Sequence, residues 1–351
     1  MPLNILLVSP FENSATGRGD RNMRLEAELK KRGHNVTFVT GDFDHARRSR
    51  ISKEELTTSG ELKVLRLPVY RKNVGIARVW CHIIFAMKLW IFAIRTRWDI
   101  VVISSIPPEA LIAARLLRKR ALVVDVRDIW PDALQAYGKP TPAARIFGFY
   151  CNTLFGFALK HASRIMVVAP GFRRWLDRYG ALTPWRVKFV PLGFRREDFR
   201  PLSNGSFDYD FCYAGGATPQ FDIQEFADEF GEQSGIVLGS GPLLDTWKTA
   251  FPNTKFLGAI PRAEAMAIMG KSRRLLFPSN PFAQLPNKAF DYFALGHPVA
   301  LGFGCSQATR YILSLRHRRA CCGNDRWEDY RNLEKEAITA RAASIVEEAI
   351  A

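Results

Sequence analysis

The sequence has 351 residues, of which 47% are hydrophobic, so two domains with sizeable cores are expected. The formal net charge is +16, but residues 1–200 hold 35 Lys and Arg against 17 Asp and Glu, whereas residues 201–351 hold 15 against 17. Only the first half is therefore expected to meet an anionic surface or polymer, and the charge excludes the second half from that role.

The start of the chain and its cysteines predict a cytoplasmic protein. Residues 1–4 lead directly into a short apolar run, which is too short for the hydrophobic region of a secretory signal and has no basic segment before it. The six cysteines show no C-x-x-C spacing, and the six histidines are scattered. We therefore expect reduced, mostly buried thiols and no structural zinc site.

The first half alternates apolar runs with helical patterns. Strands are predicted at residues 5–8, 36–40, 100–103, 121–126 and 165–168. The first strand is followed by a Gly-rich turn and by an amphipathic helix at about residues 22–32, which ends at Gly33. The strand runs are apolar throughout rather than alternating, so both faces should be covered, as in a parallel sheet of βαβ units.

Residues 76–95 form an unusually apolar and aromatic segment. Lys88 interrupts it, and Arg78, Arg95 and Arg97 flank it. Because a membrane span needs about 20 apolar residues and a central lysine is costly there, we interpret the segment as a helix at a bilayer interface. Its cations would lie at anionic headgroups, with Trp and Phe side chains below them. The alternative is a helix packed on the sheet, with Lys88 reaching out to solvent.

A polar, broken stretch at about residues 191–205 is interpreted as a linker. A second series of short apolar strands is predicted beyond it, at residues 211–214, 235–239, 255–258, 274–278 and 299–301. Two doubly wound domains joined by one linker imply a cleft between facing strand ends, and ligands of such sheets bind at the carboxyl ends of strands.

Near the end of the second half, residues 286–299 combine a Pro-led loop, a short helix and a Gly-His-Pro-Val break. Lys288 and Asp291 lie about one helical turn apart, on one face of that helix. The arrangement suits a nucleoside diphosphate, with Lys288 for phosphate and Asp291 for a diol. The alternative is a surface helix with an i,i+3 ion pair.

Several further segments share an order and spacing with this motif. In the first half they are the Gly-rich turn and residues 31–37, 104–109 and 125–131, and later in the chain residues 187–194, 213–216 and 239–243. Together with the Pro-x-Lys…Asp-Tyr motif, these segments resemble the family-4-type retaining glycosyltransferases of GT-B fold, especially the bacterial branch that builds O-antigen, capsule and exopolysaccharide sugars. The resemblance covers about residues 3–315.

This resemblance implies an α/β protein of GT-B fold, with two Rossmann-like doubly wound parallel-sheet domains facing a central cleft. Residues 1–195 would form an N-terminal domain facing the acceptor and the membrane. Residues 206–351 would form a C-terminal domain that binds the nucleotide-sugar donor.

The implied reaction is retaining transfer of a hexosyl or N-acetylhexosaminyl group from a UDP- or GDP-linked donor. The implied acceptor is a lipid-linked or membrane-presented glycan in bacterial surface polysaccharide synthesis. The nucleotide sugar is a co-substrate, and no separate cofactor is expected. The expected location is cytoplasmic, peripheral on the inner face of the cell membrane, with an anionic membrane surface as partner and no nucleic acid.

The donor half of the reaction assigns roles to four residues. Charge develops on the leaving nucleoside diphosphate, and backbone N–H groups and cations placed there stabilise the transition state. Gly215 and Gly216 would let the backbone approach the diphosphate, and Lys288 would supply a positive point charge. The resemblance places Asp291 on the ribose hydroxyls.

Further candidates are expected in the same cleft. The base should lie near Leu257 and Ile260, where backbone groups can read its edge. Arg262 is a second candidate for the phosphates, and the alternative for it is a solvent-exposed arginine in the first turn of a helix. Gly17 and Gly19 of the Gly-rich turn are expected opposite the diphosphate.

The chain departs from the family pattern on the donor side. Ala283 stands where the first Glu of the family's Glu-x7-Glu pair orients the donor sugar, so we expect polar groups of residues 280–284 to substitute for it. The frequent Arg…Lys pair near the start of the second domain is missing from residues 215–222, which leaves more of the phosphate role to Lys288.

Arg127 and Asp128 stand where many relatives place a histidine that faces the reacting sugar. Asp128 could accept a proton from the acceptor hydroxyl or orient that hydroxyl, with Arg127 beside it in the catalytic site. The alternative is an aspartate that pairs with Arg127 or caps the next turn.

Two other classes of protein share part of the pattern. Nucleotide-sugar epimerases of GT-B fold use the same diphosphate cradle but lack a basic, aromatic first domain. A basic nucleic-acid binder would need a recognition-helix or zinc-finger pattern, which the sequence lacks. No bound metal is expected, because D-x-D spacing occurs only at residues 42–44, in an Arg-rich loop, and at 208–210, beside a strand.

Overall fold

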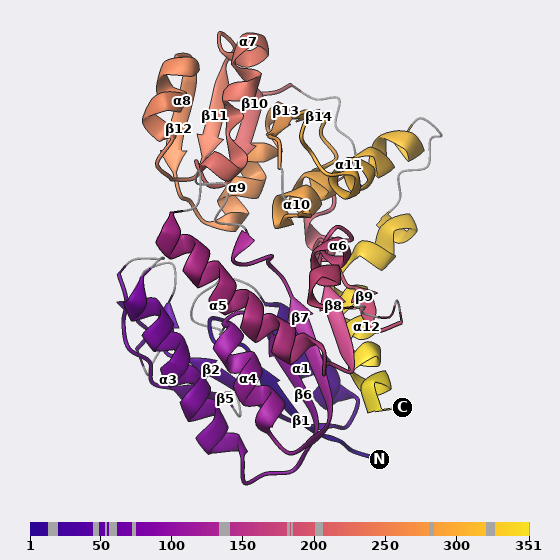
Figure 1. Cartoon of the computed structure of the whole chain (residues 1–351). Coiled ribbons are helices and arrows are strands. Elements are labelled where there is room, and N and C mark those ends of the chain that lie inside the picture. Colours follow the sequence, from indigo (N-terminus) through magenta and orange to yellow (C-terminus); the bar gives the residue numbers. More distant parts are fainter. Residues whose placement is uncertain are drawn as a thin grey trace.

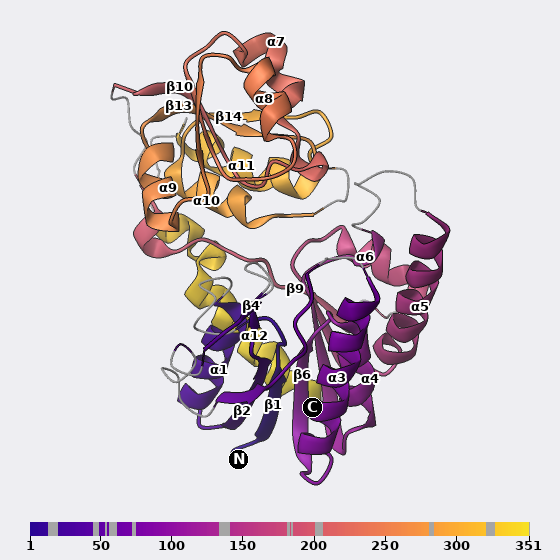
Figure 2. The same cartoon turned by 90° about the vertical axis from the view of Figure 1, so that its left-hand side faces the viewer.

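The computed structural model describes residues 1–12, 20–44, 49–52, 55, 62–71, 75–132, 141–180, 183, 185–200, 206–280, 284–320 and 327–350. In this part of the chain there are two lobes, each built on its own parallel sheet (Figures 1 and 2). A short antiparallel ribbon, β3 (Phe43–Asp44) with β4 (Ser49–Arg50), completes the first lobe.

The first lobe contains a seven-stranded sheet in the order β5-β2-β1-β6-β7-β8-β9, in which all neighbouring strands are parallel. Its strands are β1 (Asn4–Val8), β2 (Asn35–Gly41), β5 (Leu62–Leu65), β6 (Trp98–Ser104), β7 (Lys119–Val126), β8 (Arg164–Val167) and β9 (Val187–Phe189). In β1, Leu6 and Leu7 are both fully buried although they point to opposite faces. Both faces of the sheet are therefore covered, as predicted.

Helices cover the two faces of this sheet (Figure 1). One face carries α3 (Ile76–Ala93), α4 (Pro108–Leu116) and α5 (Pro142–Leu159), with the short α6 (Phe172–Leu176) beyond them. The opposite face carries α1 (Arg21–Lys31) and α12 (Lys335–Glu347). The apolar, aromatic segment predicted as a helix is α3, whereas α5 is a second long helix that the sequence analysis did not predict.

Helix α12 brings the end of the chain back to the first lobe. Its Ile338 and Val346 pack in one core cluster with Ile5 and Leu7 of β1. The chain therefore returns to the first lobe after forming the second. The range 206–351, predicted as the second domain, includes this helix of the first lobe's core.

The second lobe contains a five-stranded parallel sheet in the order β12-β11-β10-β13-β14. Its strands are β10 (Tyr209–Ala214), β11 (Gly235–Leu238), β12 (Thr254–Gly258), β13 (Ser272–Phe277) and β14 (Val299–Leu301). Its α-helices are α7 (Ala227–Phe230), α8 (Leu244–Ala250), α9 (Arg262–Met269), α10 (Asn287–Leu295) and α11 (Gln307–Ala320). The prediction of two Rossmann-like doubly wound parallel-sheet domains is confirmed.

Among the described residues, α3 is the one helix that is long and apolar enough to cross a membrane by length and composition, with a mean hydropathy of 1.6. A third of it is buried inside the first lobe, where Cys81, Phe85 and Leu89 join the core. The helix therefore packs on the sheet along one side only. The four described cysteines are buried free thiols, as predicted: Cys81, Cys151, Cys212 and Cys305.

Candidate active site

Three glycine-containing turns meet at the carboxyl ends of β10, β11 and β12. The Gly215 N–H donates to the Leu238 carbonyl over 2.8 Å, and the Gly239 N–H donates to the Gly258 carbonyl over 2.7 Å. A Cβ atom on Gly239 would lie 1.8 Å from the Gly215 carbonyl oxygen, so only glycine permits this approach. Gly216, the next residue after Gly215, remains exposed. The backbone at the carboxyl end of β10 is thus open to a ligand.

Lys288, in the first turn of α10, lies beside Gly215 in an aromatic cage. Its Nζ donates to the Tyr213 hydroxyl over 3.2 Å and lies 3.8 Å from the ring centroid of Phe221. A Cβ on Gly215, whose φ is +153°, would come within 3.5 Å of this Nζ and 2.8 Å of the Tyr213 hydroxyl. Burial lowers the pKa of Lys288 to about 7.

Within the described residues, no carboxylate forms an ion pair with Lys288. Among the described residues, its partners are aromatic faces and one hydroxyl, and these compensate a buried ammonium poorly. Lys288 and Asp291 do not form the i,i+3 ion pair that was the alternative interpretation, because Asp291 pairs with another residue. An uncompensated cation beside open glycine backbone is the arrangement of an anion site.

Asp291 lies on the same helix and binds Arg262, the first residue of α9. Arg262 Nη2 lies 2.6 Å from Asp291 Oδ1 and 2.6 Å from Asp198 Oδ2. Burial alone would lower the pKa of Arg262, but its hydrogen bonds to Asp198 and the charges of both carboxylates raise it. Burial also raises the pKa of Asp291 despite the arginine. Since two carboxylates already occupy Arg262, Lys288 is the more available cation for a phosphate.

The residues predicted to bind the base lie at the same end of the sheet, where β12 ends. Leu257 is exposed near the end of β12, and Ile260 is half-buried in the turn before α9. Gly258 between them has a φ of +71° and nothing within 4 Å of a built Cβ. Gly17 and Gly19 lie outside the described residues, as does Ala283, so the structure does not place them.

The first lobe contributes the opposite wall through Arg127 and Asp128, which follow β7. Arg127 does not pair with Asp128. Its Nη1 lies 2.6 Å from Glu12 Oε2, and its Nη2 donates to Ser104 Oγ over 2.7 Å. Since Glu12 follows β1 and Ser104 ends β6, Arg127 ties three strand ends together. The guanidinium is therefore held among partners of the first lobe.

A second buried pair supports this wall and was missed from the sequence. Arg21, at the start of α1, donates to both carboxylate oxygens of Asp125 over 2.9 and 3.0 Å. Arg21 also donates to the Pro191 carbonyl over 3.0 Å, where the chain leaves the first lobe. The sequence did indicate that Asp125 has a partner, because an aspartate inside an apolar strand needs a buried group to pair with.

Asp128 reaches across the cleft. Its Oδ1 accepts from the Ile129 N–H over 2.8 Å, so it caps the next turn as the alternative interpretation had it. The same oxygen accepts from Gln284 Nε2 of the second lobe over 3.3 Å, and Gln284 Oε1 accepts from Gln220 over 2.7 Å. Burial raises the pKa of Asp128, although its backbone hydrogen bond and Arg78 act the other way.

Asp128 also borders a cavity of about 290 Å³ in the first lobe, whose walls include Glu12, Arg78 and Ser105. A carboxylate with a raised pKa, at a cavity edge and in contact with the second lobe, can accept a proton from a hydroxyl bound there. Asp128 of the first lobe thus contacts the segment of the second lobe that leads into α10 and Lys288.

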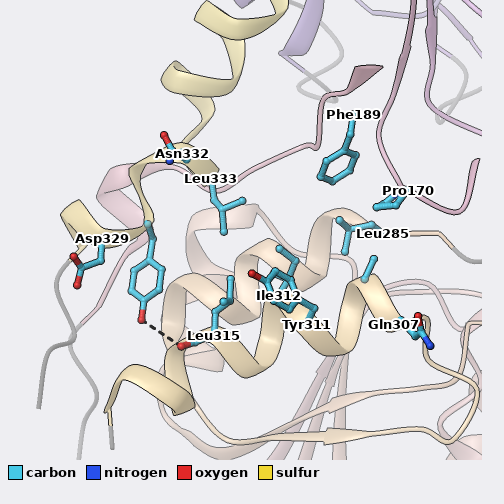
Figure 3. Close-up of a pocket in the computed structure, with 12 residues that line it drawn as sticks. Pro170, Phe189, Leu285, Gln307, Tyr311, Ile312, Leu315, Asp329, Asn332 and Leu333 are labelled. Atoms are coloured by element: carbon cyan, nitrogen blue, oxygen red, sulfur yellow. Dashed lines mark hydrogen bonds between the residues drawn. The ribbon is translucent and has the colours of Figure 1, made fainter. Parts of the chain in front are cut away.

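A larger, mostly apolar pocket of about 580 Å³ lies elsewhere between the lobes (Figure 3). Pro170 and Phe189 of the first lobe face Leu285, Tyr311 and Ile312 of the second. It contains none of the predicted site residues and no cation, so its chemistry does not suit a diphosphate. Within the described residues, no group of three or more His, Cys, Asp or Glu gathers to hold a metal ion.

Two kinds of comparison relate the chain to known proteins. A family model described as "Glycosyl transferase 4-like domain" matches residues 16–193, just over half of the chain. No curated protein sequence matches it. Among solved structures, sucrose-phosphate synthase from Thermosynechococcus elongatus matches with a TM-score of 0.66 at 14% identity, covering 98% of both chains.

Two further solved structures match at lower scores. HepE of Anabaena, in complex with UDP-glucose, gives a TM-score of 0.54 at 14% identity over 99% of this chain and 95% of its own. A Listeria monocytogenes protein named as a UDP-N-acetylglucosamine 2-epimerase gives 0.54 at 10% identity over 99% and 96%. At these identities the likeness shows the fold, which is GT-B.

Proposed function

The chain belongs to the family of glycosyl transferase 4-like domains, and from this premise we propose that it moves a sugar from a UDP- or GDP-linked donor to a lipid-linked glycan acceptor with retention of configuration. Glycosyl transfer follows from the family. The nucleoside diphosphate, the acceptor and the stereochemistry are proposals, supported by the chemistry of the cleft and by the family-4-type motifs.

The observation that carries the proposal is the environment of Lys288. Its ammonium lies in an aromatic cage beside the Gly215 backbone and forms no ion pair within the described residues. A diphosphate would supply the missing negative charge. In such a poorly solvated site, a fixed positive charge acts more strongly than in water. Because charge grows on the diphosphate as the sugar leaves, Lys288 would stabilise the transition state more than the bound donor.

The nucleoside would extend from Lys288 along the carboxyl ends of the second-lobe strands. Asp291, one helical turn further along α10, is the proposed ligand of the ribose hydroxyls. Its carboxylate has one oxygen hydrogen-bonded to Arg262 over 2.6 Å, and a carboxylate can accept several such bonds. The base would lie near Leu257 and Ile260, beside backbone groups at the end of β12.

Asp128 is the proposed residue for the acceptor. Its carboxylate borders the first-lobe cavity and touches the second lobe through Gln284. A hydroxyl entering that cavity would meet a base whose pKa is raised by burial. Gln284 immediately follows Ala283, the position where the family usually has its donor-sugar glutamate. Its amide is the candidate to substitute for that glutamate, as expected for residues 280–284.

The acceptor class and the location rest on the first lobe. Its sequence carries the whole basic excess of the chain, and α3 exposes apolar side chains on its outer side. We therefore place the protein at the cytoplasmic side of an anionic membrane, acting in bacterial surface polysaccharide synthesis. Retention, and a hexosyl or N-acetylhexosaminyl group as the sugar that is transferred, are proposed from the family-4-type resemblance.

A thermal-shift screen of UDP- and GDP-linked sugars tests the donor proposal. A ligand that binds only the folded protein raises its melting temperature, so sugars of one nucleotide should stabilise the wild type and stabilise Lys288→Ala much less. No shift with any nucleotide sugar would overturn the proposal. Epimerisation of a stabilising donor in the absence of acceptor would instead support the epimerase alternative, whose fold is the same.

A further inference from the structure

The outer side of α3 carries a continuous apolar stripe. Ile76, Trp80, Met87 and Ile91 are all more than half exposed, and their spacing places them on one side of the helix. The inner side is occupied by the buried residues that pack on the sheet. A soluble helix normally turns charged or polar side chains to water here. This helix instead presents large hydrophobic side chains outward, and such a patch marks an interaction surface.

Helix α5 repeats the pattern. Ile146 is 71% exposed and Phe149 is 77% exposed, and Phe157 lies further along the same side. The inner residues Cys151 and Phe155 are fully buried. Both long helices of this face therefore carry large apolar side chains on the outer side as well as on the inner side.

The first halves of α3 and α5 are held together by shared partners. The guanidinium of Arg78, on α3, lies 4.3 Å from the ring centroid of Trp130, which packs edge-on against Phe147 of α5 at 5.1 Å. Glu109 of α4 accepts from the Tyr150 hydroxyl of α5 over 3.0 Å and lies 3.4 Å from His82 of α3. Figures 1 and 2 show the three helices on the same face of the first sheet. The two stripes therefore lie on the same face of the first lobe, on either side of α4.

The charge of this surface decides which partner fits it. The two 18-residue helices contain no Asp or Glu. Lys88 and Arg145 are exposed on them, and Arg95, Arg97 and Lys160 follow their ends, all exposed. Large apolar side chains with cations and no acids are complementary to anionic lipid, because the apolar groups enter the acyl boundary while the cations remain at the headgroups.

The surface also reaches the site. Arg78 and Asp128 line the same cavity, and Arg78 belongs to the first turn of α3, in which the exposed stripe begins at Ile76. The first turn of α3 therefore contains both a residue that lines the proposed acceptor cavity and the start of the apolar stripe.

We infer that α3 and α5 form one bilayer-docking face for anionic lipid, which sets the acceptor cavity of Asp128 at the membrane surface. This inference deepens the proposed function, and it rests on that function because it takes the acceptor to be lipid-linked. It adds that α5 takes part equally with α3, and that the first turns of both helices lie at the membrane end of the cleft. A lipid-linked glycan would then enter the cavity along the surface rather than from solution.

Vesicle co-sedimentation tests the inference. Vesicles of phosphatidylcholine with phosphatidylglycerol should retain the full-length protein at low salt, and vesicles of phosphatidylcholine alone should retain less. The double variant Ile146→Ser/Phe149→Ser should lower the vesicle-bound to free ratio about tenfold or more, since each buried apolar side chain contributes about 1.5–3 kcal/mol. Trp80→Ser should lower it through α3. The thermal unfolding of all three proteins should agree, because these side chains are exposed.

Trp185→Ser is the matched control. Trp185 is 56% exposed and lies between two arginines of the first lobe, Arg164 and Arg186, but outside α3 and α5. Its loss should leave vesicle binding unchanged. Equal binding by the α5 double variant, or an equal loss with Trp185→Ser, would overturn the inference.

A wild-type dimer that Phe149→Ser converts to a monomer, without vesicle binding, would assign the face to a second copy and also overturn it. Thermal shifts by nucleotide sugars on the same preparations keep the two proposals apart. A protein that binds the donor but not vesicles refutes the docking face alone, and one that binds vesicles but no donor refutes the proposed function.

Discussion

Gln284 of the second lobe donates its side-chain amide to Asp128 Oδ1 of the first lobe over 3.3 Å. The bond joins the two lobes at the carboxylate proposed as the base. Gln284 is itself held by Gln220, so its amide has a fixed orientation. The loop that leads into α10, and so to Lys288, is thereby coupled to the acceptor side.

Asp128→Asn should lower turnover by about 10²–10⁴-fold, the usual contribution of a positioned general base, while donor affinity stays near that of the wild type. Asparagine keeps the size of the side chain but cannot take a proton. The measurement is kcat, together with nucleotide-sugar affinity by calorimetry.

Gln284→Ala separates positioning from proton transfer. Loss of the amide donor disfavours the charged carboxylate, so the acidic limb of the pH–rate profile should move to higher pH. In Asp128→Asn that limb should disappear. Unchanged kcat in Asp128→Asn would remove Asp128 from the chemistry.

Helix α12 should stabilise the first lobe even though the chain reaches it last. Ile338 is buried, and its Cδ1 atom would lie 2.5 Å from a Cβ atom on Gly193, where the chain leaves this lobe. Ile338→Ala should cost about 2–5 kcal/mol of unfolding free energy, as for other large-to-small core changes. Urea unfolding followed by circular dichroism measures it. The exposed Glu348→Ala on the following turn should cost nothing measurable, and equal midpoints for both variants would contradict this role of α12.

The fold could be predicted because its signals are local. An apolar run such as residues 5–8 is buried on both faces wherever it pairs, so it indicates a parallel strand without knowledge of its neighbours. Helix α5 was missed for the opposite reason. It exposes Ile146 and Phe149 where a helix of a soluble protein carries polar residues, so the 3.6-residue alternation was hidden. The return of α12 to the first lobe depends on tertiary packing that no local pattern contains.

The same distinction holds for the site. Lys288 and Asp128 could be proposed from residue type and position in a motif. The partners of the arginines could not be predicted, because they are far away in the sequence. Arg262 binds Asp198, in the segment that connects the two lobes, and Arg127 binds Glu12, which follows β1. Sequence spacing brings Arg127 next to Asp128, but the fold turns the two side chains to different partners.

Asp291→Ala should weaken nucleotide-sugar binding by about tenfold or more, because a hydrogen bond to a charged group contributes about 1.5–3 kcal/mol. The sharper measurement compares ribose with deoxyribose. The wild type should prefer a nucleoside diphosphate with both hydroxyls, and Asp291→Ala should lose that preference.

Asp198→Ala is the matched control for this role, because it removes the other carboxylate of Arg262 and leaves Asp291 in place. It should retain the ribose preference. If both variants lose it equally, the preference depends on Arg262 rather than on Asp291.

Donor binding should take up a proton above neutral pH. Burial lowers the pKa of Lys288 to about 7, so its amine is mostly neutral in the free protein at about pH 8. A bound diphosphate favours the charged form and raises that pKa again. Binding is then linked to protonation, and affinity should fall as the pH rises through the pKa of the free protein.

Calorimetric titration with a nucleotide sugar, in two buffers of different ionisation enthalpy, measures this linkage. At about pH 8 the wild type should take up close to one proton per donor, and at about pH 6 almost none, because Lys288 is already charged there. A nucleotide sugar is the right ligand, since its diphosphate carries no terminal phosphate to titrate in this range. Lys288→Arg is the matched control: it keeps the charge at every pH, so its uptake should vanish. Uptake that persists in Lys288→Arg would place the titrating group elsewhere in the cleft.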